Sequence, residues 1–223
     1  DMSGNLSILG NLDTSGVATI GYANTATGKN AVAMGNNNTA SGNYSIATGY
    51  TTKAQGIYSS TFGFETSAED NYAVAMGYRS RAIGEFSIAM GNDVSAIAQS
   101  TIAMGTRAIA SGTRAVAIGG DISAADYGSM TIGQFNNQNS GPNSAGAFDS
   151  QNMAFVIGSG TGTSNRKDAF AVRYDGATDV FGTLDISGNT DISGSLTLHN
   201  NLIMNTGPGN NNIDLSGNLD MSG

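Results

Sequence analysis

Small and large apolar residues alternate over residues 17–133 in a pattern that repeats every 14 positions. A glycine marks each repeat, at positions 21, 35, 49, 63, 77, 91, 105, 119 and 133. The residue two positions before each glycine is Ala or Thr, whereas the residues one and three positions before it are mostly Val, Ile, Met or Phe. Because side chains alternate between the two faces of a strand, each repeat predicts a short strand with one small face and one large apolar face.

Each repeat also contains a second group of small residues. Ala stands five positions after each of the first eight glycines, and Gly follows two positions later in five of these eight copies. Fourteen residues divided in this way suit two short strands and two tight turns, and glycine permits the positive φ that such turns need. The sequence therefore predicts an all-β chain in which residues 17–133 form nine coils of a β-solenoid or β-roll.

The small face of the predicted strand is expected inside the roll and the large apolar face outside it, because a narrow two-stranded roll has room only for Ala-sized side chains. A stripe nine coils tall would exceed the few hundred Å² of contiguous apolar surface that soluble monomers usually expose. We therefore expect this stripe to be buried between chains. The candidate interface residues are Val32, Met34, Ile46, Val74, Met76, Ile88, Met90, Ile102, Met104, Val116 and Ile118.

Aromatic residues follow the same period in two ladders. One ladder, five residues before the repeat glycine, contains Tyr44, Tyr58, Tyr72 and Phe86; the other, one residue after it, contains Tyr50, Phe64 and Tyr78. Both positions share the parity of the large apolar residues, so in an extended strand they would flank the same outward face. One interpretation is stacking within or beside an interface between chains. The other is a surface strip, Tyr50, Phe64 and Tyr78, that stacks on sugar rings.

Three segments of the repeat carry a resemblance to a known family. The strings AVAMG at 31–35, SIAMG at 87–91 and TIAMG at 101–105, each followed by a later Ala-x-Gly or a variant of it, resemble the head repeat of trimeric autotransporter adhesins. The resemblance implies a left-handed parallel β-roll in a homotrimer, with heads that bind host matrix or other surfaces. Similar repeats also occur in phage and viral fibres, so the resemblance favours a fold more strongly than a function.

The ends of the chain follow a different period, of six residues. Leu184, Thr190, Leu196 and Leu202 are six apart, and related strings occupy residues 1–16 and 214–223. Two apolar residues and a glycine in each hexad suit a triangular β-prism wrapped by three chains. We therefore predict an N-terminal hexad stem at 1–16, the β-roll head at 17–133, a cap or transition region at 134–168, and a C-terminal hexad stem at 169–223. Residues 168–223 more loosely resemble the stems of phage and viral tail fibres.

Two further features concern the cap and the chain ends. Residues 155–158, with the sequence FVIG, look like one delayed coil inside the cap region. The string DMSG stands at both 1–4 and 220–223, in the same hexad phase, and the chain begins with Asp1 rather than Met. These ends predict that the chain is an excerpt, one unit of a tandem array in which copies follow one another along a filament.

Composition narrows the possible partners. The chain has 223 residues with a net charge of −8, no Cys, and only 12% charged residues. A negative chain with few Lys and Arg is not expected to bind nucleic acid, and without Cys it can form no disulfide. It contains no apolar run of about 18 residues, so no membrane insertion is expected. The sparse arginines Arg79, Arg81, Arg107 and Arg114 are expected to pair with Glu65, Glu69, Asp70 or Glu85.

Catalytic chemistry is not expected. The single His, His199, cannot supply a triad or a multi-His metal site within one chain, although three copies would converge on a trimer axis. Recurrent hexad acids such as Asp185 and Asp191 are more simply explained as solvated corners than as calcium ligands. We predict no catalytic residues, no cofactor and no metal site.

These observations leave two functional hypotheses. The first is a structural, homotrimeric fibre segment, extracellular, on a virion or a cell-surface appendage, which projects from a surface and contributes to attachment. The alternative is an adhesin head module that binds a surface glycan or a host matrix protein.

Overall fold

The computed structural model describes residues 16–138, 144–187, 190–193 and 197. The chain divides into two units, Asp1–Thr183 and Leu184–Gly223. All strands lie in the first unit, and the described part of the chain is all-β and contains no helix. In the second unit the described residues include the exposed side chains of Leu184, Ile186 and Ile192.

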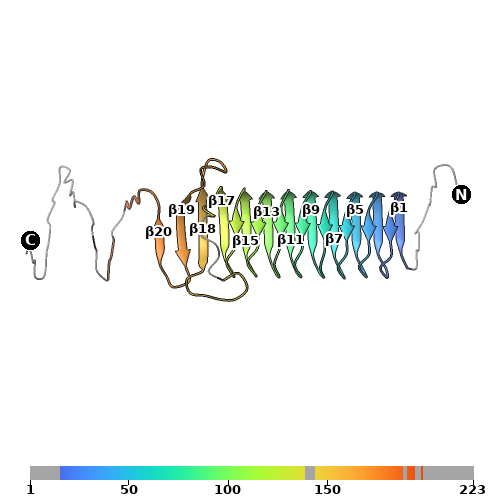
Figure 1. The fold of residues 1–223 in the computed structure, drawn as a ribbon, viewed down its shortest axis with the longest axis horizontal. Coiled ribbons are helices and arrows are strands. Elements are labelled where there is room, and N and C mark those ends of the chain that lie inside the picture. The colour runs from blue at the N-terminus through green and yellow to red at the C-terminus, as the bar shows by residue number, and fades with distance from the viewer. Residues whose placement is uncertain (1–15, 139–143, 188–189, 194–196, 198–223) are drawn as a thin grey trace, which may run out of the picture. The chain divides into compact units, whose positions relative to one another are not determined.

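Two sheets run along the first unit. The wide sheet contains 12 strands in the order β1-β3-β5-β7-β9-β11-β13-β15-β17-β18-β19-β20, side by side in Figure 1. Its strands are β1 (Ala18–Tyr22), β3 (Val32–Asn36), β5 (Ile46–Tyr50), β7 (Ser60–Phe64), β9 (Val74–Tyr78), β11 (Ile88–Asn92), β13 (Ile102–Thr106), β15 (Val116–Gly120), β17 (Met130–Gln134), β18 (Met153–Ser159), β19 (Asp168–Arg173) and β20 (Thr178–Val180).

The narrow sheet contains eight strands of two residues each. These strands are β2 (Thr25–Ala26), β4 (Thr39–Ala40), β6 (Lys53–Ala54), β8 (Ser67–Ala68), β10 (Arg81–Ala82), β12 (Ser95–Ala96), β14 (Ile109–Ala110) and β16 (Ser123–Ala124). One wide and one narrow strand make one coil, as predicted from the sequence. The result is a β-solenoid of about eight turns.

The coils stack in parallel with a constant shift of 14 residues. Ile88 pairs with Ile102 and Ala89 with Ala103, so every position lies over its own counterpart in the next coil. This register places side chains of one kind in continuous ladders along the solenoid. The predicted delayed coil at 155–158 is confirmed, because β18 pairs in parallel with β17. Beyond it the chain reverses, and β19 and β20 continue the wide sheet in antiparallel pairing.

Alanine fills the interior between the two sheets, as the small face of the sequence pattern predicts. Ala89 and Ala103 on the wide side and Ala96 and Ala110 on the narrow side are completely buried. Two further interior ladders lie four residues before and three residues after the repeat glycine. The first includes Ala31, Ser45, Ser59, Ala73, Ser87, Thr101 and Ala115, and the second includes Asn38, Thr52, Thr66, Ser80, Val94, Ala108 and Ile122.

Glycine is required at two positions of the coil for two different reasons. Gly105 has a φ of +119°, and a Cβ there would lie 2.1 Å from the carbonyl oxygen of Gly119 in the next coil. Gly112 has no positive φ, but a Cβ would lie 2.1 Å from the carbonyl oxygen of Asp126. The expectation that this second glycine supplies a positive φ is therefore wrong. The left-handed turn residues are other side chains, such as Tyr58 (φ +58°) and Arg107 (φ +51°).

Candidate functional site: the outer surfaces of the solenoid

The large apolar residues of the wide sheet point away from the interior. We call this surface the apolar face; it contains the predicted interface residues from Val32 to Ile118. The Ala residues that alternate with them are buried, whereas Met34, Ile46 and Ile118 expose 36, 38 and 40% of their surface in the single chain. The other predicted interface residues are half-buried. Because like residues stack from coil to coil, the apolar face is continuous along the solenoid.

The outward residues of the narrow sheet are mostly polar, and we call this surface the polar face. They are Thr25, Thr39, Lys53, Ser67, Arg81, Ser95, Ile109 and Ser123. Arg81 donates to Glu69 across 2.9 Å, so part of this charge is paired within the surface. Ile109 is the apolar exception among these positions, which means that the polar face has no continuous apolar stripe.

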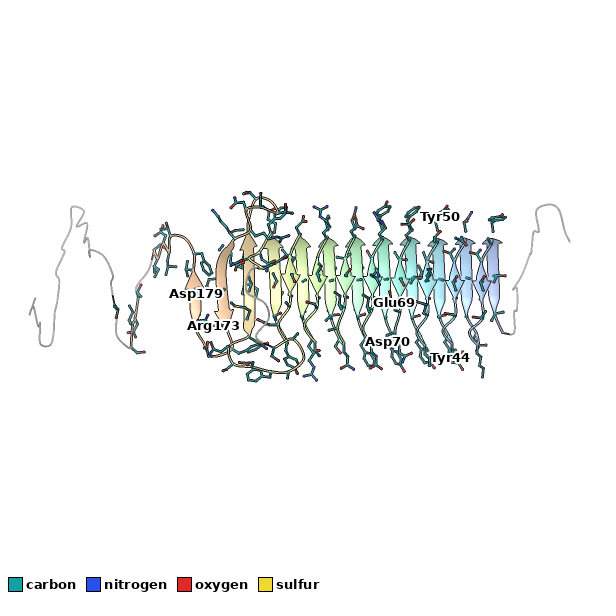
Figure 2. The ribbon with its side chains drawn as sticks, in the orientation of Figure 1. Tyr44, Tyr50, Glu69, Asp70, Arg173 and Asp179 are labelled. Carbon is teal, nitrogen blue, oxygen red and sulfur yellow. The ribbon has the colours of Figure 1, made fainter. Side chains whose placement is uncertain are left out.

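The two aromatic ladders lie at opposite edges of the solenoid, as the labelled Tyr44 and Tyr50 show in Figure 2. The expectation that both flank one outward face required an extended chain between the ladder and the strand. Tyr44 instead has a φ of +58° and lies in the turn before β5. The turn conformation moves this ladder to its own edge.

Rings in both ladders stack face to face. Tyr44, Tyr58, Tyr72 and Phe86 are separated by centroid distances of 4.9, 5.4 and 4.9 Å. Tyr50, Phe64 and Tyr78 are separated by 5.1 Å at each step. In such a stack only the ring edges and the outer faces of the end rings are open to another molecule. The guanidinium of Arg79 lies 5.7 Å from the ring centroid of Tyr78.

A ladder of alternating charge adjoins the Tyr50 ladder, two residues after the repeat glycine. Glu65, Arg79, Asp93, Arg107 and Asp121 follow one another on consecutive coils. The Nε atom of Arg79 lies 3.6 Å from a carboxylate oxygen of Glu65 and 3.6 Å from one of Asp93. Arg107 donates two hydrogen bonds of 2.6 Å to the carboxylate of Asp121. These bonds lower the pKa of Asp121 and raise that of Arg107.

The expected pairing of arginines with nearby acids is confirmed for Arg79 with Glu65 and for Arg81 with Glu69. The pair of Arg107 with Asp121 was missed, although the 14-residue spacing between them is visible in the sequence. Exposed pairs such as Arg79 with Glu65 contribute little stability. These ion pairs are better understood as matching the charges of each coil to those of the next coil.

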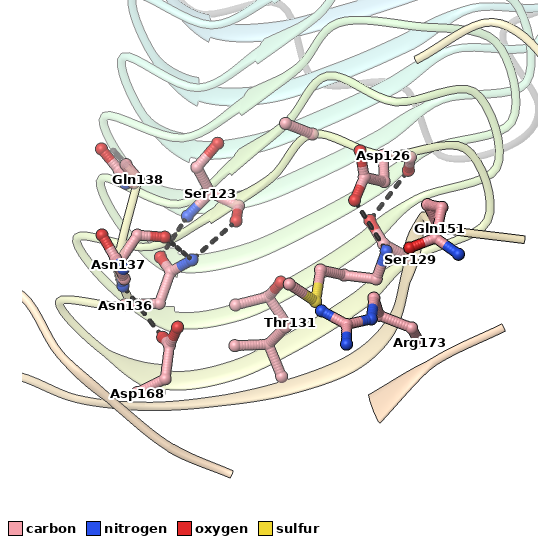
Figure 3. Close-up of a pocket in the computed structure, with 13 residues that line it drawn as sticks. Ser123, Asp126, Ser129, Thr131, Asn136, Asn137, Gln138, Gln151, Asp168 and Arg173 are labelled. Carbon is pink, nitrogen blue, oxygen red and sulfur yellow. Dashed lines mark hydrogen bonds between the residues drawn. The ribbon is translucent and has the colours of Figure 1, made fainter. Parts of the chain in front are cut away.

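A cavity of about 320 Å³ lies at the C-terminal end of the solenoid, where the wide sheet continues after the last narrow strand (Figure 3). The amide of Asn136 accepts from the backbone N–H of Ser123 and donates to its carbonyl. Asp126 accepts from the N–H of Met153 at 2.7 Å, and Asp168 accepts from the N–H of Asn137 at 2.9 Å. Burial raises the pKa of Asp168. These polar groups hold the cap together.

The described residues also bear on metal binding and on membrane insertion. Over the ranges that the structure describes, no three His, Cys, Asp or Glu side chains come together as a metal site would need. No described helix is long and apolar enough to cross a membrane. His199 and the hexad acids Asp1, Asp13, Asp214 and Asp220 lie outside the described residues. Asp185 and Asp191 are described and are exposed.

Coils of 14 residues with an Ala interior, one apolar outer face and one polar outer face define a β-roll of the adhesin-head class. Six segments, of which the first five overlap, match the family model of the YadA head domain repeat, at residues 20–38, 26–52, 40–66, 54–80, 68–93 and 96–121. The solenoid is thus built of YadA head domain repeats, the head repeats of trimeric autotransporter adhesins. The resemblance seen in the sequence is confirmed. No curated protein matches the chain.

The matched repeats, within residues 20–121, bear on a broad functional class. YadA head repeats belong to homotrimeric adhesin heads that are exposed at the cell surface, and such a β-solenoid is a structural kind of protein. The chain is accordingly an adhesin-like, tandem-repeat fibre module.

Proposed function

We propose that this chain is a segment of an extracellular homotrimeric fibre, in which three apolar faces meet along one axis and the polar faces remain in water. The observation that carries the proposal is the contrast between the two outer faces of the same coils. Apolar surface is the main source of stability in permanent assemblies, whose interfaces are more apolar than the remaining protein surface. A continuous apolar face therefore favours a permanent seam.

The candidate seam residues have the geometry that such a seam needs. Val74, Ile88 and Ile102 form one outward ladder and Met76, Met90 and Met104 form the other, each in register from strand to strand. Methionine is flexible and fills irregular gaps, so a Met ladder tolerates the small mismatches at a three-chain junction. The Ala positions between the two ladders point inward, and Thr48 and Ser60 are the polar side chains on the outward face between Val32 and Ile118.

Paired double substitutions test the seam on the same two coils. Met90→Asp with Met104→Asp places charges on the apolar face, and sedimentation of the full chain is expected to change from a trimer to a monomer or an aggregate. Ser95→Asp with Ile109→Asp places the same charges on the polar face of those coils and is expected to leave the trimer intact. A trimer that survives the first pair, or dissociates with the second, would contradict the assignment of the apolar face.

The fibre is proposed to project from a virion or a cell-surface appendage and to contribute to attachment. YadA head repeats favour a cell surface, because heads of that family are adhesin modules. The gene that encodes this chain and the genes that flank it distinguish a virion from a cell surface. Capsid and tail genes would indicate a virion, whereas a membrane-anchor domain in the same chain would indicate a cell surface.

A second candidate function is direct binding of a glycan or a host matrix protein by the Tyr50 ladder. The supporting observation is that Tyr50, Phe64 and Tyr78 remain exposed at one edge. Because their faces stack on one another, a sugar would contact the ring edges and hydroxyl groups or the outer face of an end ring. A glycan array with the wild-type chain and with Tyr50→Ala plus Tyr78→Ala tests this function. A glycan that binds the wild type but not the variant supports this function. An array on which no glycan binds the wild type favours a chain that acts only as a structural spacer.

We also propose that the hexad segments form β-prism stems on either side of the roll, with copies of the chain in tandem along the filament. The stem was predicted from residue 169; because the wide sheet uses residues up to Val180, we now propose that the C-terminal stem begins at Leu184, the first residue of the second unit. Most hexad positions lie outside the described residues. A parent gene without a second copy of the unit would contradict the tandem arrangement.

A further inference from the structure

Three tyrosines lie on top of one another at one edge of the solenoid. Tyr44 and Tyr58 have centroids 4.9 Å apart with an interplanar angle of 8°, and Tyr58 and Tyr72 have centroids 5.4 Å apart with an angle of 14°. Phe86 continues the stack at 4.9 Å from Tyr72. All three phenols therefore have another phenol on a neighbouring coil.

The backbone fixes this arrangement. Each of the three tyrosines has a φ of +58°, and the N–H of each donates to the coil before it, as Tyr58 N does to Asn43 O at 2.9 Å. The backbones that carry the rings cannot move apart along the solenoid unless the stacked coils separate, whereas the exposed rings can rotate about their side-chain bonds. The tyrosine side chains are nevertheless accessible, since 39, 50 and 48% of the surface of Tyr44, Tyr58 and Tyr72 is exposed.

Stacked phenols have the geometry that radical coupling requires. One-electron oxidation of a phenol, with loss of its proton, gives a phenoxyl radical whose unpaired electron is shared by the oxygen and the ortho and para carbons. The orbital that holds this electron is perpendicular to the ring. In two nearly parallel rings these orbitals point at one another, so the first contact between ortho carbons is face to face.

We propose that Tyr44, Tyr58 and Tyr72 form a dityrosine cross-linking site that joins adjacent coils within one chain. Two phenols each lose one electron and one proton, and one carbon–carbon bond forms between their ortho carbons. Each of these carbons then loses its hydrogen as a proton, taken up by water, while its phenoxyl oxygen regains one, and both rings become aromatic again. The oxidant is a small one-electron acceptor such as a ruthenium(III) polypyridyl complex, of which two equivalents are reduced to ruthenium(II).

The other aromatic ladder provides an internal control. Phe64 separates Tyr50 from Tyr78 and stacks on both at 5.1 Å, so neither of these tyrosines has a phenol beside it in the stack. Tyr50 and Tyr78 are exposed like the Tyr44 ladder. They should therefore be oxidised at similar rates without coupling to one another. A cross-link in the first ladder but not in the second would follow from stacking rather than from exposure alone.

The consequence for the fibre would be a covalent bond between coils. A Tyr44–Tyr58 bond closes a loop of 14 residues. The Tyr58 ring has two ortho carbons, so after it couples to Tyr44 through one of them it can still couple to Tyr72 through the other. Such bonds limit the conformations of the unfolded chain, as disulfides do. The chain has no Cys, so this ladder offers covalent reinforcement that disulfides cannot supply here.

Photo-oxidation of the dilute full chain with tris(bipyridyl)ruthenium(II), and persulfate to generate ruthenium(III), tests the site. Dityrosine fluorescence is expected in the band that migrates as a single chain in denaturing electrophoresis. Tryptic peptide mass spectrometry with fragmentation is expected to place the bond between Tyr44 and Tyr58 or between Tyr58 and Tyr72, with two hydrogen atoms lost.

Conservative variants identify the tyrosines responsible. Tyr58→Phe keeps a ring in the stack but removes both phenol–phenol neighbours, and the intrachain fluorescence should fall to background. Tyr78→Phe, in the control ladder, should leave it unchanged. The proposal is overturned if Tyr58→Phe retains the signal, if the bonds map to Tyr22, Tyr127 or Tyr174, or if only chains linked to other chains fluoresce.

Discussion

The two outer faces of the solenoid belong to the same coils and differ in nearly every property that governs assembly. Both faces cover an interior of buried Ala, such as Ala103 beneath the wide sheet and Ala110 beneath the narrow one. Outside, the wide sheet presents ladders of Val, Ile and Met, whereas the narrow sheet presents mainly Ser, Thr and charged residues. The interior therefore specifies the coil, and the exterior separates a face suited to contact with other chains from a face suited to water.

The largest effect is expected inside, where the two sheets should behave alike. Ala103→Leu and Ala110→Leu each add a large side chain to a completely buried position. Each should lower the free energy of unfolding by roughly 1–3 kcal/mol, because overpacking a dense core displaces the backbone. Urea titration followed by circular dichroism measures this loss. The conservative control Ile109→Leu, on the polar face, should change it by less than about 0.5 kcal/mol.

The outer faces should respond differently to one and the same substitution. Ile97 and Ile102 are five residues apart, but Ile97 follows the narrow strand β12 whereas Ile102 begins β13 on the apolar face. Ile102→Ala should lower stability by roughly 1–2 kcal/mol per chain, because Ile102 is half-buried in the single chain and the proposed seam would bury the rest of its side chain. Ile97→Ala, at a side chain 41% exposed, should cost less than about 0.5 kcal/mol. If the two variants lost equal stability in thermal unfolding, the proposed difference between the apolar face and the polar face would be contradicted.

The cap should show a smaller, pH-dependent effect. Burial raises the pKa of Asp168, so the folded state favours the protonated carboxyl and is penalised once this group ionises. Asp168→Asn keeps an acceptor for the N–H of Asn137 and removes the ionisable group. The variant should melt at a higher temperature than the wild type near neutral pH. Its advantage should disappear as the pH falls below the raised pKa; an advantage that grew towards low pH would contradict this assignment.

The smallest effect is expected on the charged edge between the faces. Arg107 lowers the pKa of Asp121 below the ordinary value of 3.8, so the pair stabilises the fold at pH values above that value and loses its contribution as the pH falls through the lowered pKa. Asp121→Asn should therefore melt slightly below the wild type at neutral pH and match it in acid. Neither condition should change the number of chains in the assembly, as sedimentation at both pH values would establish.

The period and the direction of each side chain in the wide strand could be read from the sequence. Small residues such as Ala89 share one parity and large ones such as Met90 the other, and strand geometry then fixes which face is inside. The interior ladder of Ser45 and Thr101 was not predicted, although every member of it is small. The ladder from Asn38 to Ile122 was not predicted either, because it mixes amides, hydroxyls and branched alkyl groups in one buried line.

The turns could not be predicted as well as the strands. Tyr58 and Arg107 adopt a left-handed conformation that the sequence pattern assigns to glycine, because parallel stacking imposes the same turn on every coil whatever its side chain. This conformation moves the Tyr44 ladder to its own edge. The hairpin of β19 and β20 was also missed, since residues 169–180 were assigned to the C-terminal stem with the hexads, on a loose resemblance to tail-fibre stems.

Native mass spectrometry of the wild-type chain over a dilution series tests most directly whether the apolar face is a permanent seam. The chain has a mass of 22.6 kDa, and the expected result is one species with three times this mass that persists on dilution. A folded species of 22.6 kDa, with the circular dichroism of the undiluted protein, would show that the apolar face is stable in water and would contradict the trimer.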